Sequence, residues 1–360
     1  RCSVPYLALE IGQYEIVGWQ SVQIQRSLDT VADSFNVSLS SPFSSAATQV
    51  TIREGDPVKV TYDGILVLSG YIDDVEENSD ASSFTLSISG RSKAKDLVDC
   101  SALHKGAWRN TPLFIIIEDI AKPFGILVAT ELTDMPVERS FRLQDSETAW
   151  DAIHRLVSDY GCRVVSRPDG TLVLTRTGRR VYPDIVIERG VNVVSGGVKR
   201  SESERFSQYI FKASAAADDD NYGEAAASAY ALTDDGVGRY RPLVVHKEGK
   251  GGKLQSALKQ AAAWERNTRA GKSQTLSYRV LTPGDPSRSW EMPNGHGLWA
   301  PNLVVAVRDS NHLVDGQFLI TSVTFNRSNA GTTTQLELTH PEAYEPEKPP
   351  KKKGKKGYTW

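Results

Sequence analysis

The chain has 360 residues, of which 39% are hydrophobic and 24% are charged, and its formal net charge is −2 at pH 7. This balance is typical of a folded globular protein and excludes a largely disordered chain. A net charge so close to zero gives no overall field that would attract nucleic acid or an anionic membrane. The length favours two to four domains.

The sequence gives no sign of a membrane or secretory segment. The longest apolar run, residues 113–117, is far shorter than the roughly 20 residues that cross a bilayer. The first residues lack the apolar core of a secretory signal. The cysteines, Cys2, Cys100 and Cys162, form no CxxC pair, so we expect reduced thiols in a protein made in the cytosol.

Short strands are expected in the first hundred residues. Residues 21–25 and 58–62 alternate apolar and polar side chains, which is typical of half-buried strands. Asp63 and Gly64 follow the second run and precede another apolar run, which predicts a two-residue hairpin turn. We expect a β-barrel-like domain over residues 1–97.

The pattern then changes to that of an α/β domain, expected over residues 98–184. A helix is predicted with Thr111 as its N-cap and Pro112 at its first position. A second helix is expected to begin near Asp145 or Ser146, because apolar residues recur after them at helical spacing. A hairpin is expected to turn at residues 168–170, which read Pro-Asp-Gly.

The remaining chain reads as two further domains and a tail. We expect a mixed α/β domain over 185–280, with a mobile loop at 215–235 and a helix at 254–268. A β domain is expected over 281–345, and a Lys- and Pro-rich solvated tail over 346–360. The fold class is therefore predicted as α+β and β-rich, with several small domains.

No catalytic motif is found in the sequence. The Gly-rich residues 249–253 lack Walker A spacing, and no HExxH or GxSxG motif occurs. Residues 218–223 lack the later glutamate of a calcium loop. Asp151, His154 and Ser158 lie on one predicted helix, which cannot easily aim all three at one reacting atom. We expect no enzyme, no cofactor, no metal site and no small-molecule substrate.

One motif and four other segments stand out by their order along the chain. The motif is residues 90–101, Gly-Arg-Ser-Lys-Ala-Lys-Asp-Leu-Val-Asp-Cys-Ser. The first of the other segments is 19–35, and the second is 55–58 with 63–64 and 69–72. The third is 141–150 with 169–172, and the fourth is 297–302 with 315–320. Taken in this order, the motif and the segments resemble the Mu-type phage tail protein P family of contractile-tail baseplate hub proteins, from about residue 17 to 345. The motif residues singled out as structural are Gly90, Arg91, Ser92, Asp96, Leu97, Asp99 and Ser101.

The resemblance implies a homotrimer in which each subunit carries two β-barrel or sandwich domains like those of the tail tube, with an α/β insertion domain beside them. Three subunits would present six such domains to the six-fold tube, and the other face would seat the three-fold central spike. The implied partners are a second and third copy, the tail tube protein, the spike protein and other baseplate proteins. The implied location is the virion baseplate, assembled in the host bacterial cytoplasm.

A lysine cluster in the tail falls outside this resemblance. It is interpreted as a solubilising tail or as a partner-binding segment, and nucleic-acid binding is not expected because no aromatic residues lie between the lysines. Its members are Lys351, Lys352, Lys353, Lys355 and Lys356.

Two alternatives remain open. The first is the hub-like part of a bacterial contractile secretion spike, which has the same architecture in another context. The second is a phage-associated peptidoglycan hydrolase, because the chain has 44 acidic residues and their pairing in space is not visible in a sequence.

Overall fold

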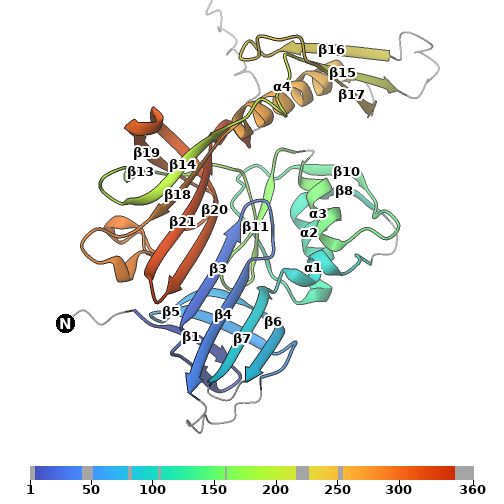
Figure 1. Ribbon diagram of the computed structural model, residues 1–360. Helices are drawn as coiled ribbons and strands as arrows, with labels where there is room; N and C mark the ends of the chain where they lie inside the picture. The colour runs from blue at the N-terminus through green and yellow to red at the C-terminus, as the bar shows by residue number, and fades with distance from the viewer. Residues whose placement is uncertain are drawn as a thin grey trace, which may run out of the picture. The chain divides into compact units, whose positions relative to one another are not determined.

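A computed structural model of the protein shows a β-rich α+β fold with several sheets and small domains (Figure 1). The chain divides into two compact units: unit 1 is Arg1–Val198 with Thr275–Pro341, and unit 2 is Lys199–Gln274 with Glu342–Trp360. In the described part of the chain, no helix is both long and apolar enough to cross a membrane. The structure describes residues 5–42, 52–79, 83–103, 107–158, 160–215, 227–249 and 254–344.

Most strands of unit 1 belong to one large sheet. Its neighbouring strands from β18 to β2 along the main path, and β19 with β20, pair antiparallel, whereas β13 and β19 pair in parallel. The main path through the sheet runs β14-β18-β21-β20-β3-β4-β7-β6-β5-β1-β2, and β19 joins β20 to β13. The strands are β1 Leu7–Ile11, β2 Tyr14–Ile16, β3 Ser21–Ser27, β4 Ser34–Pro42, β5 Pro57–Tyr62, β6 Ile65–Ser79, β7 Ser83–Ser92, β13 Arg180–Glu188, β14 Val193–Arg200, β18 Gln274–Val280, β19 Leu303–Asp309, β20 Val314–Ser328 and β21 Gly331–Thr339.

The alternating pattern in the sequence explains these strands. In β3, Val22, Ile24 and Arg26 are buried and the residues between them are more exposed, because successive side chains of a strand point to opposite faces. The hairpin between β5 and β6 turns at Asp63 and Gly64, with φ of +49° and +77°, as the Asp-Gly pair predicts.

An α/β block with its own core falls between the two strand-rich parts of unit 1 in the sequence and lies beside them in space (Figure 1). Its two small sheets are β8–β10 and β11–β12–β9, and the apolar faces of α2 and α3 are buried. The elements are α1 Lys95–Asp99, β8 Trp108–Pro112, α2 Leu113–Ala121, η1 Lys122–Phe124, β9 Val128–Thr130, β10 Val137–Phe141, α3 Ala149–Ser158, β11 Arg163–Ser166 and β12 Leu172–Thr175.

One detail of the predicted helix start is wrong. Thr111 is not an N-cap but the fourth residue of β8, where it pairs with Glu138 of β10. The cap is Pro112, which has no N–H to donate, and α2 begins at Leu113. The strand pairing therefore extends one residue further than the helix signal indicated, while the hairpin of β11 and β12 is as predicted.

Unit 2 is a three-stranded sheet with a helix against one face. The strands are β15 Gln208–Ala215, β16 Ala227–Thr233 and β17 Pro242–Gly249, in the order β16-β15-β17. The helix is α4 Leu254–Lys272, whose Leu258 and Ala262 pack with Tyr209 and Phe211 of β15. The expectation of a loop throughout 215–235 is wrong for β16, which pairs with β15 along its whole length; residues 216–226 lie outside the described part.

Unit 2 interrupts the chain between two neighbouring strands of the large sheet, β14 and β18. The two ends of this segment meet, because the Ser201 N–H donates to the Ser273 carbonyl at 2.8 Å. Such closeness of ends is the usual geometry of an inserted domain. The boundaries expected from the sequence at residues 97, 184 and 280 stay a prediction.

Candidate functional site: a repeated strand module and its joint

The large sheet contains the same arrangement of strands twice. We call β3–β7 the first module, and β14 with β18–β21 the second module. In each, a 15-residue strand, β6 or β20, is the middle strand of a three-strand meander. Beyond β7 lie β4 and then β3; beyond β21 lie β18 and then β14.

The two modules also share their irregularities. The register of the long strand shifts directly after Ile72 in β6 and directly after Ile320 in β20. The carbonyl of Ile72 accepts from the Gly55 N–H at 2.8 Å, and that of Ile320 accepts from the Asn302 N–H at 2.9 Å. Both donors have positive φ, +83° and +68°. The two bulges lie at corresponding positions and are bonded by corresponding residues, which marks the modules as structural repeats.

Within one chain the two modules are joined edge to edge. β3 of the first module pairs antiparallel with β20 of the second, with Ile24 opposite Phe325. Trp290 packs between Tyr62 of the first module and Phe325 of the second, at centroid distances of 4.8 and 5.1 Å. The buried residues of both modules form one hydrophobic core. The modules are therefore a fixed pair.

The 90–101 motif begins where β6 and β7 approach most closely. A Cβ on Gly90 would overlap the Tyr71 carbonyl oxygen and the Phe35 ring, and a Cβ on Gly70 would overlap the Arg91 carbonyl. Only glycine leaves room for this approach. The motif thus begins with a residue that the strand packing requires.

Charged residues of the motif form a compact network. Arg91 donates through Nε to Asp73 at 2.7 Å, and through Nη1 and Nη2 to both oxygens of Asp99 at 3.1 and 2.7 Å. Lys95 reaches the other oxygen of Asp73 at 2.5 Å. Burial raises the pKa of Asp73, but the hydrogen bonds from Arg91 and Lys95 outweigh burial and lower it. Asp73 is the bulged residue of β6, so the bulge supplies the network with its carboxylate.

Ser92 connects this network to the α/β block. Its hydroxyl accepts from the Asp33 N–H at 3.1 Å, and its own N–H donates to the Asp33 carbonyl at 2.8 Å. The Asp33 carboxylate pairs with Arg26 at 3.0 Å, and Arg26 also donates to the Ser166 carbonyl of β11 at 3.2 Å. Burial raises the pKa of Asp33 in spite of Arg26. The pair therefore links the first module to β11.

The last part of the motif lies in the α/β block. Leu97 is fully buried in the core of that block. Asp96 is in the first turn of α1, and its carbonyl accepts from the Cys100 N–H at 3.0 Å. Ser101 forms a β-bridge with Thr148. The structure thus brings all seven predicted motif residues into one joint between the first module and the α/β block, and their role as a structural motif of the family stays a prediction.

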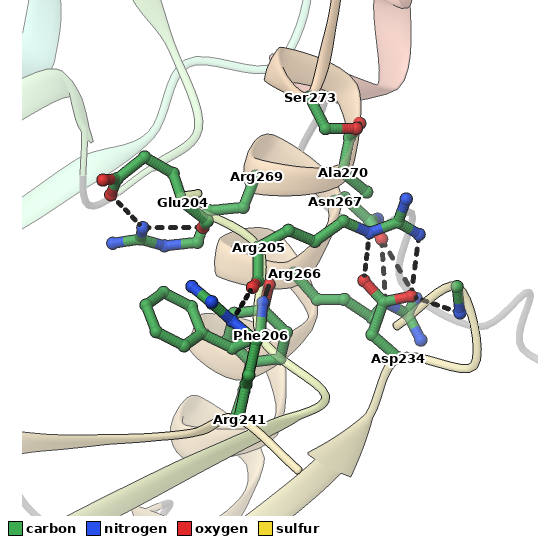
Figure 2. A network of polar contacts seen from close by, with 12 residues as sticks. Glu204, Arg205, Phe206, Asp234, Arg241, Arg266, Asn267, Arg269, Ala270 and Ser273 are labelled. Carbon is green, nitrogen blue, oxygen red and sulfur yellow. Dashed lines mark hydrogen bonds and ion pairs between the residues drawn. The ribbon is translucent and has the colours of Figure 1, made fainter. Parts of the chain in front are cut away.

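Arginines hold the segment of unit 2 that leads into β15 (Figure 2). Arg205 forms a two-point ion pair with Asp234, at 2.7 and 2.8 Å. Arg241 donates to the Ser203 and Arg205 carbonyls, and Arg269 donates to the Glu204 carbonyl. Burial raises the pKa of Asp234, but the hydrogen bonds from Arg205 outweigh burial and lower it. These contacts fix the entry to unit 2.

Metal-ligating side chains do not cluster in the described part of the chain. No group of three or more His, Cys, Asp or Glu side chains is placed there to hold a metal ion. The lysine cluster at Lys351, Lys352, Lys353, Lys355 and Lys356 lies outside the described residues.

Family models match most of the chain. Residues 6–92 match the model described as Mu phage baseplate assembly protein GpP-like, N-terminal; residues 94–176 match baseplate hub protein gp44-like, second domain; and residues 255–347 match Mu phage baseplate assembly protein GpP, fourth domain. The chain belongs to the Mu-type family of phage baseplate hub proteins. The 90–101 motif of this hub spans the junction of the first two matched domains.

Individual relatives support the assignment to this family. The hub protein is 28% identical to baseplate hub protein gp44 of Escherichia phage Mu over an alignment of 340 residues, and the match covers 91% of this chain and 86% of gp44. It is similar to the 43 kDa tail protein of prophage MuSo2 from Shewanella oneidensis, with 28% identity, a TM-score of 0.82 and coverage of 95% and 99% of the two chains. The tail protein from Neisseria meningitidis MC58 shares its fold, with 24% identity, a TM-score of 0.80 and the same coverage. The protein is therefore a baseplate hub protein of a Mu-like phage and a component of the virion.

The resemblance implied two tube-like domains, but the residues that mark the repeat of modules were not singled out from the sequence. Residues 24–27 read Ile-Gln-Arg-Ser and residues 198–201 read Val-Lys-Arg-Ser, and these stand at the same place in the two modules of the hub. Four residues are too short a signal to establish a repeat by themselves. The register shifts in the structure supply the rest.

Proposed function

We propose that three copies of this hub protein close into a ring that joins the six-fold tail tube of a contractile tail to its three-fold central spike. The observation that carries the proposal is the repeated module. Two modules per chain give six modules in a trimer, so one face of the ring offers a repeating surface to a six-fold tube. The other face keeps three-fold symmetry and seats the spike.

Physical chemistry supports a ring. A module leaves strand edges that are templates for further pairing, and a protein must cover or pair them. Head-to-tail contacts between copies cover such edges and end in a closed assembly when the rotation closes. Obligate interfaces of this kind commonly bury more than about 2,000 Å². The tail tube protein, the spike protein and other baseplate proteins are the proposed partners.

The mass in solution tests the ring. Light scattering on the purified full chain at micromolar concentration is expected to give three times the chain mass of 39.5 kDa. A monomer under these conditions, across a range of salt concentrations, would contradict the proposal.

We propose that the hub works by contacts alone, without catalysis. Its relatives are structural baseplate proteins. The peptidoglycan hydrolase alternative predicts that the purified protein clears a suspension of cell walls at catalytic rates and loses this activity when one carboxylate is changed. Cell walls that stay intact at stoichiometric protein support the structural function.

We propose that the hub is assembled in the host bacterial cytoplasm and leaves the cell in phage particles. The secretion-spike alternative shares the fold: a type VI secretion component, the E. coli c3393 protein, has a TM-score of 0.55 at 11% identity and with coverage of 95% and 79% of the two chains. Mass spectrometry of purified particles separates the two contexts. The hub is expected with tail and capsid proteins, and its recovery with secretion-sheath proteins alone would favour the alternative.

A further inference from the structure

The second module has an open strand edge where the first module is paired. β3 lies between β4 and β20, so both of its edges are paired. β14 holds the same place beside β18, but among the described residues its other edge meets no strand apart from one bridge between Arg189 and Val193. Val194 of this edge strand is 50% exposed. An exposed edge of this kind is a template for another strand.

The first module has the matching open edge. Ser322–Arg327 of β20 pair with β21 on one side and with β3 on the other. The counterpart residues of β6, from Asp74 to Ser79, pair with β7 on one side. On the other side, where β20 meets β3, no described strand lies beside them. The side chains of Glu76 and Glu77 there are exposed.

We propose that β14 of one copy pairs antiparallel with β6 of the next copy, and so repeats between chains the β3–β20 pairing found within the chain. This inference rests on the trimeric ring proposed above and names the surface that closes it. Each chain then contributes one closed junction and two open edges. Three chains joined in this way have six equivalent junctions, which close the ring.

The neighbouring strands define the register. Val22 of β3 is paired with Val37 of β4. Tyr278 takes the place of Val37 in β18, and Gly196 lies so close to it that a Cβ there would overlap the Tyr278 ring. Gly196 thus corresponds to Val22, and the Val-Lys-Arg-Ser and Ile-Gln-Arg-Ser sequences align from there.

Charge supports this register between copies. Within the chain, Gln25 lies opposite Thr324, and both are neutral. The counterparts of these residues are Lys199 and Glu76, so that the same position between copies places opposite charges across the two strands. Directly opposite charges in a sheet are favourable, and like charges are unfavourable. β14 is therefore matched to the acidic edge of β6, and the neutral edge of β20 is already occupied.

Arg200 and Glu77 add a second contact on the other face of the strands. In the same register these two residues are diagonal neighbours, a separation that a long arginine side chain spans. The pairing thus places a basic and an acidic residue together on each face of the sheet.

A disulfide between copies tests the register. Gly197→Cys and Asn78→Cys are expected to lie directly opposite each other; a Cβ on Gly197 meets open space, and Asn78 is exposed. In a chain that also carries Cys2→Ser and Cys100→Ser, mild oxidation is expected to give covalent dimers and trimers on a denaturing gel, and a reductant is expected to reverse them.

The matched control is Gly197→Cys with Glu77→Cys, in the same background. Glu77 is one residue along β6 and points to the opposite face, so cross-linking is expected to fall strongly. A trimer by light scattering whose Gly197/Asn78 pair does not cross-link, or cross-links no better than the control, overturns the pairing and leaves the ring proposal standing. A wild-type chain that stays monomeric overturns both.

Charge reversal provides a second measurement that needs no disulfide. Lys199→Glu and Glu76→Lys, each alone, are expected to raise the dissociation constant between copies by about fivefold at low salt. The two changes together are expected to restore most of the affinity, because the pair is then inverted and not removed. Two single variants without effect, or a double variant with the sum of both losses, overturns the proposed pairing.

Discussion

At the scale of single residues, charged side chains stabilise the hub by linking separate elements through hydrogen bonds. Asp309, at the end of β19, is 1% exposed and accepts hydrogen bonds from Arg189, Tyr278 and His312 at 2.8 Å each. Burial by itself raises the pKa of Asp309, but these hydrogen bonds outweigh it and hold the pKa well below its usual range. Asp309 therefore stabilises the fold in its charged form.

The pH dependence of stability follows from this direction. A carboxylate whose pKa is lowered by folding contributes stability above its unfolded pKa, about 3.8, and loses that contribution as the pH falls toward its folded pKa. Asp309→Asn is expected to lower the free energy of unfolding at pH 7 by about 2 to 3 kcal/mol, and the difference from wild type is expected to shrink below about pH 4. Denaturant unfolding at several pH values measures this, with Asp315→Asn, at an exposed position, as the control. Parallel curves for wild type and Asp309→Asn would contradict it.

At the scale of elements, the close approach of β6 and β7 is the most restrictive packing in the first module. Gly90 stands against the Tyr71 carbonyl and the Phe35 ring with no space for a methyl group. Its neighbour Arg91 carries the ion pairs to Asp73 and Asp99. A change at Gly90 therefore disturbs the strands and the charged network together.

Gly90→Ala is expected to destabilise the hub by about 1 to 3 kcal/mol, because an added methyl group must push apart β6, β7 and the Phe35 ring. Thermal or denaturant unfolding measures the change. Gly238→Ala is the matched control, since a Cβ there meets open space, and its effect is expected to be near zero. Equal effects of the two variants would show that the approach of the strands tolerates a side chain.

At the scale of the whole molecule, unit 2 is an insertion between β14 and β18, where the first module has only the short turn between β3 and β4. Its ends meet at Ser201 and Ser273. Unit 1 has its own cores, and among the residues that the structure describes these cores include none of unit 2. Unit 1 therefore has what an independent fold needs.

Excision of residues 202–272, with Ser201 and Ser273 joined by a two-residue turn and the chain ended at Pro341, is expected to leave unit 1 folded. Circular dichroism should report a β-rich protein, and thermal unfolding should be cooperative. An unfolded or aggregated product would contradict the insertion and would make unit 2 a necessary part of the hub fold.

Local signals in the sequence determined the elements. Alternation predicted β3 and β5, the Asp63-Gly64 pair predicted the first hairpin, and the spacing of apolar residues predicted α3. The sequence also predicted a helix over most of α4. The 90–101 motif, with the other ordered segments, predicted the hub family. These features are properties of residues close together in the chain, so periodicity and turn chemistry are enough to reveal them.

Only the tertiary structure decided how the elements combine. β3 pairs with β20 across nearly the whole length of the chain, and no local pattern specifies a partner so distant. The equivalence of the modules became visible through a bulge after Ile72 and a bulge after Ile320. Strand register depends on both paired strands, so the sequence of one strand does not reveal it. The ion pairs of Arg91 with Asp73 and Asp99 could not be predicted from the sequence for the same reason. Arg91 and Asp73 come together because the bulge of β6 places Asp73 beside β7.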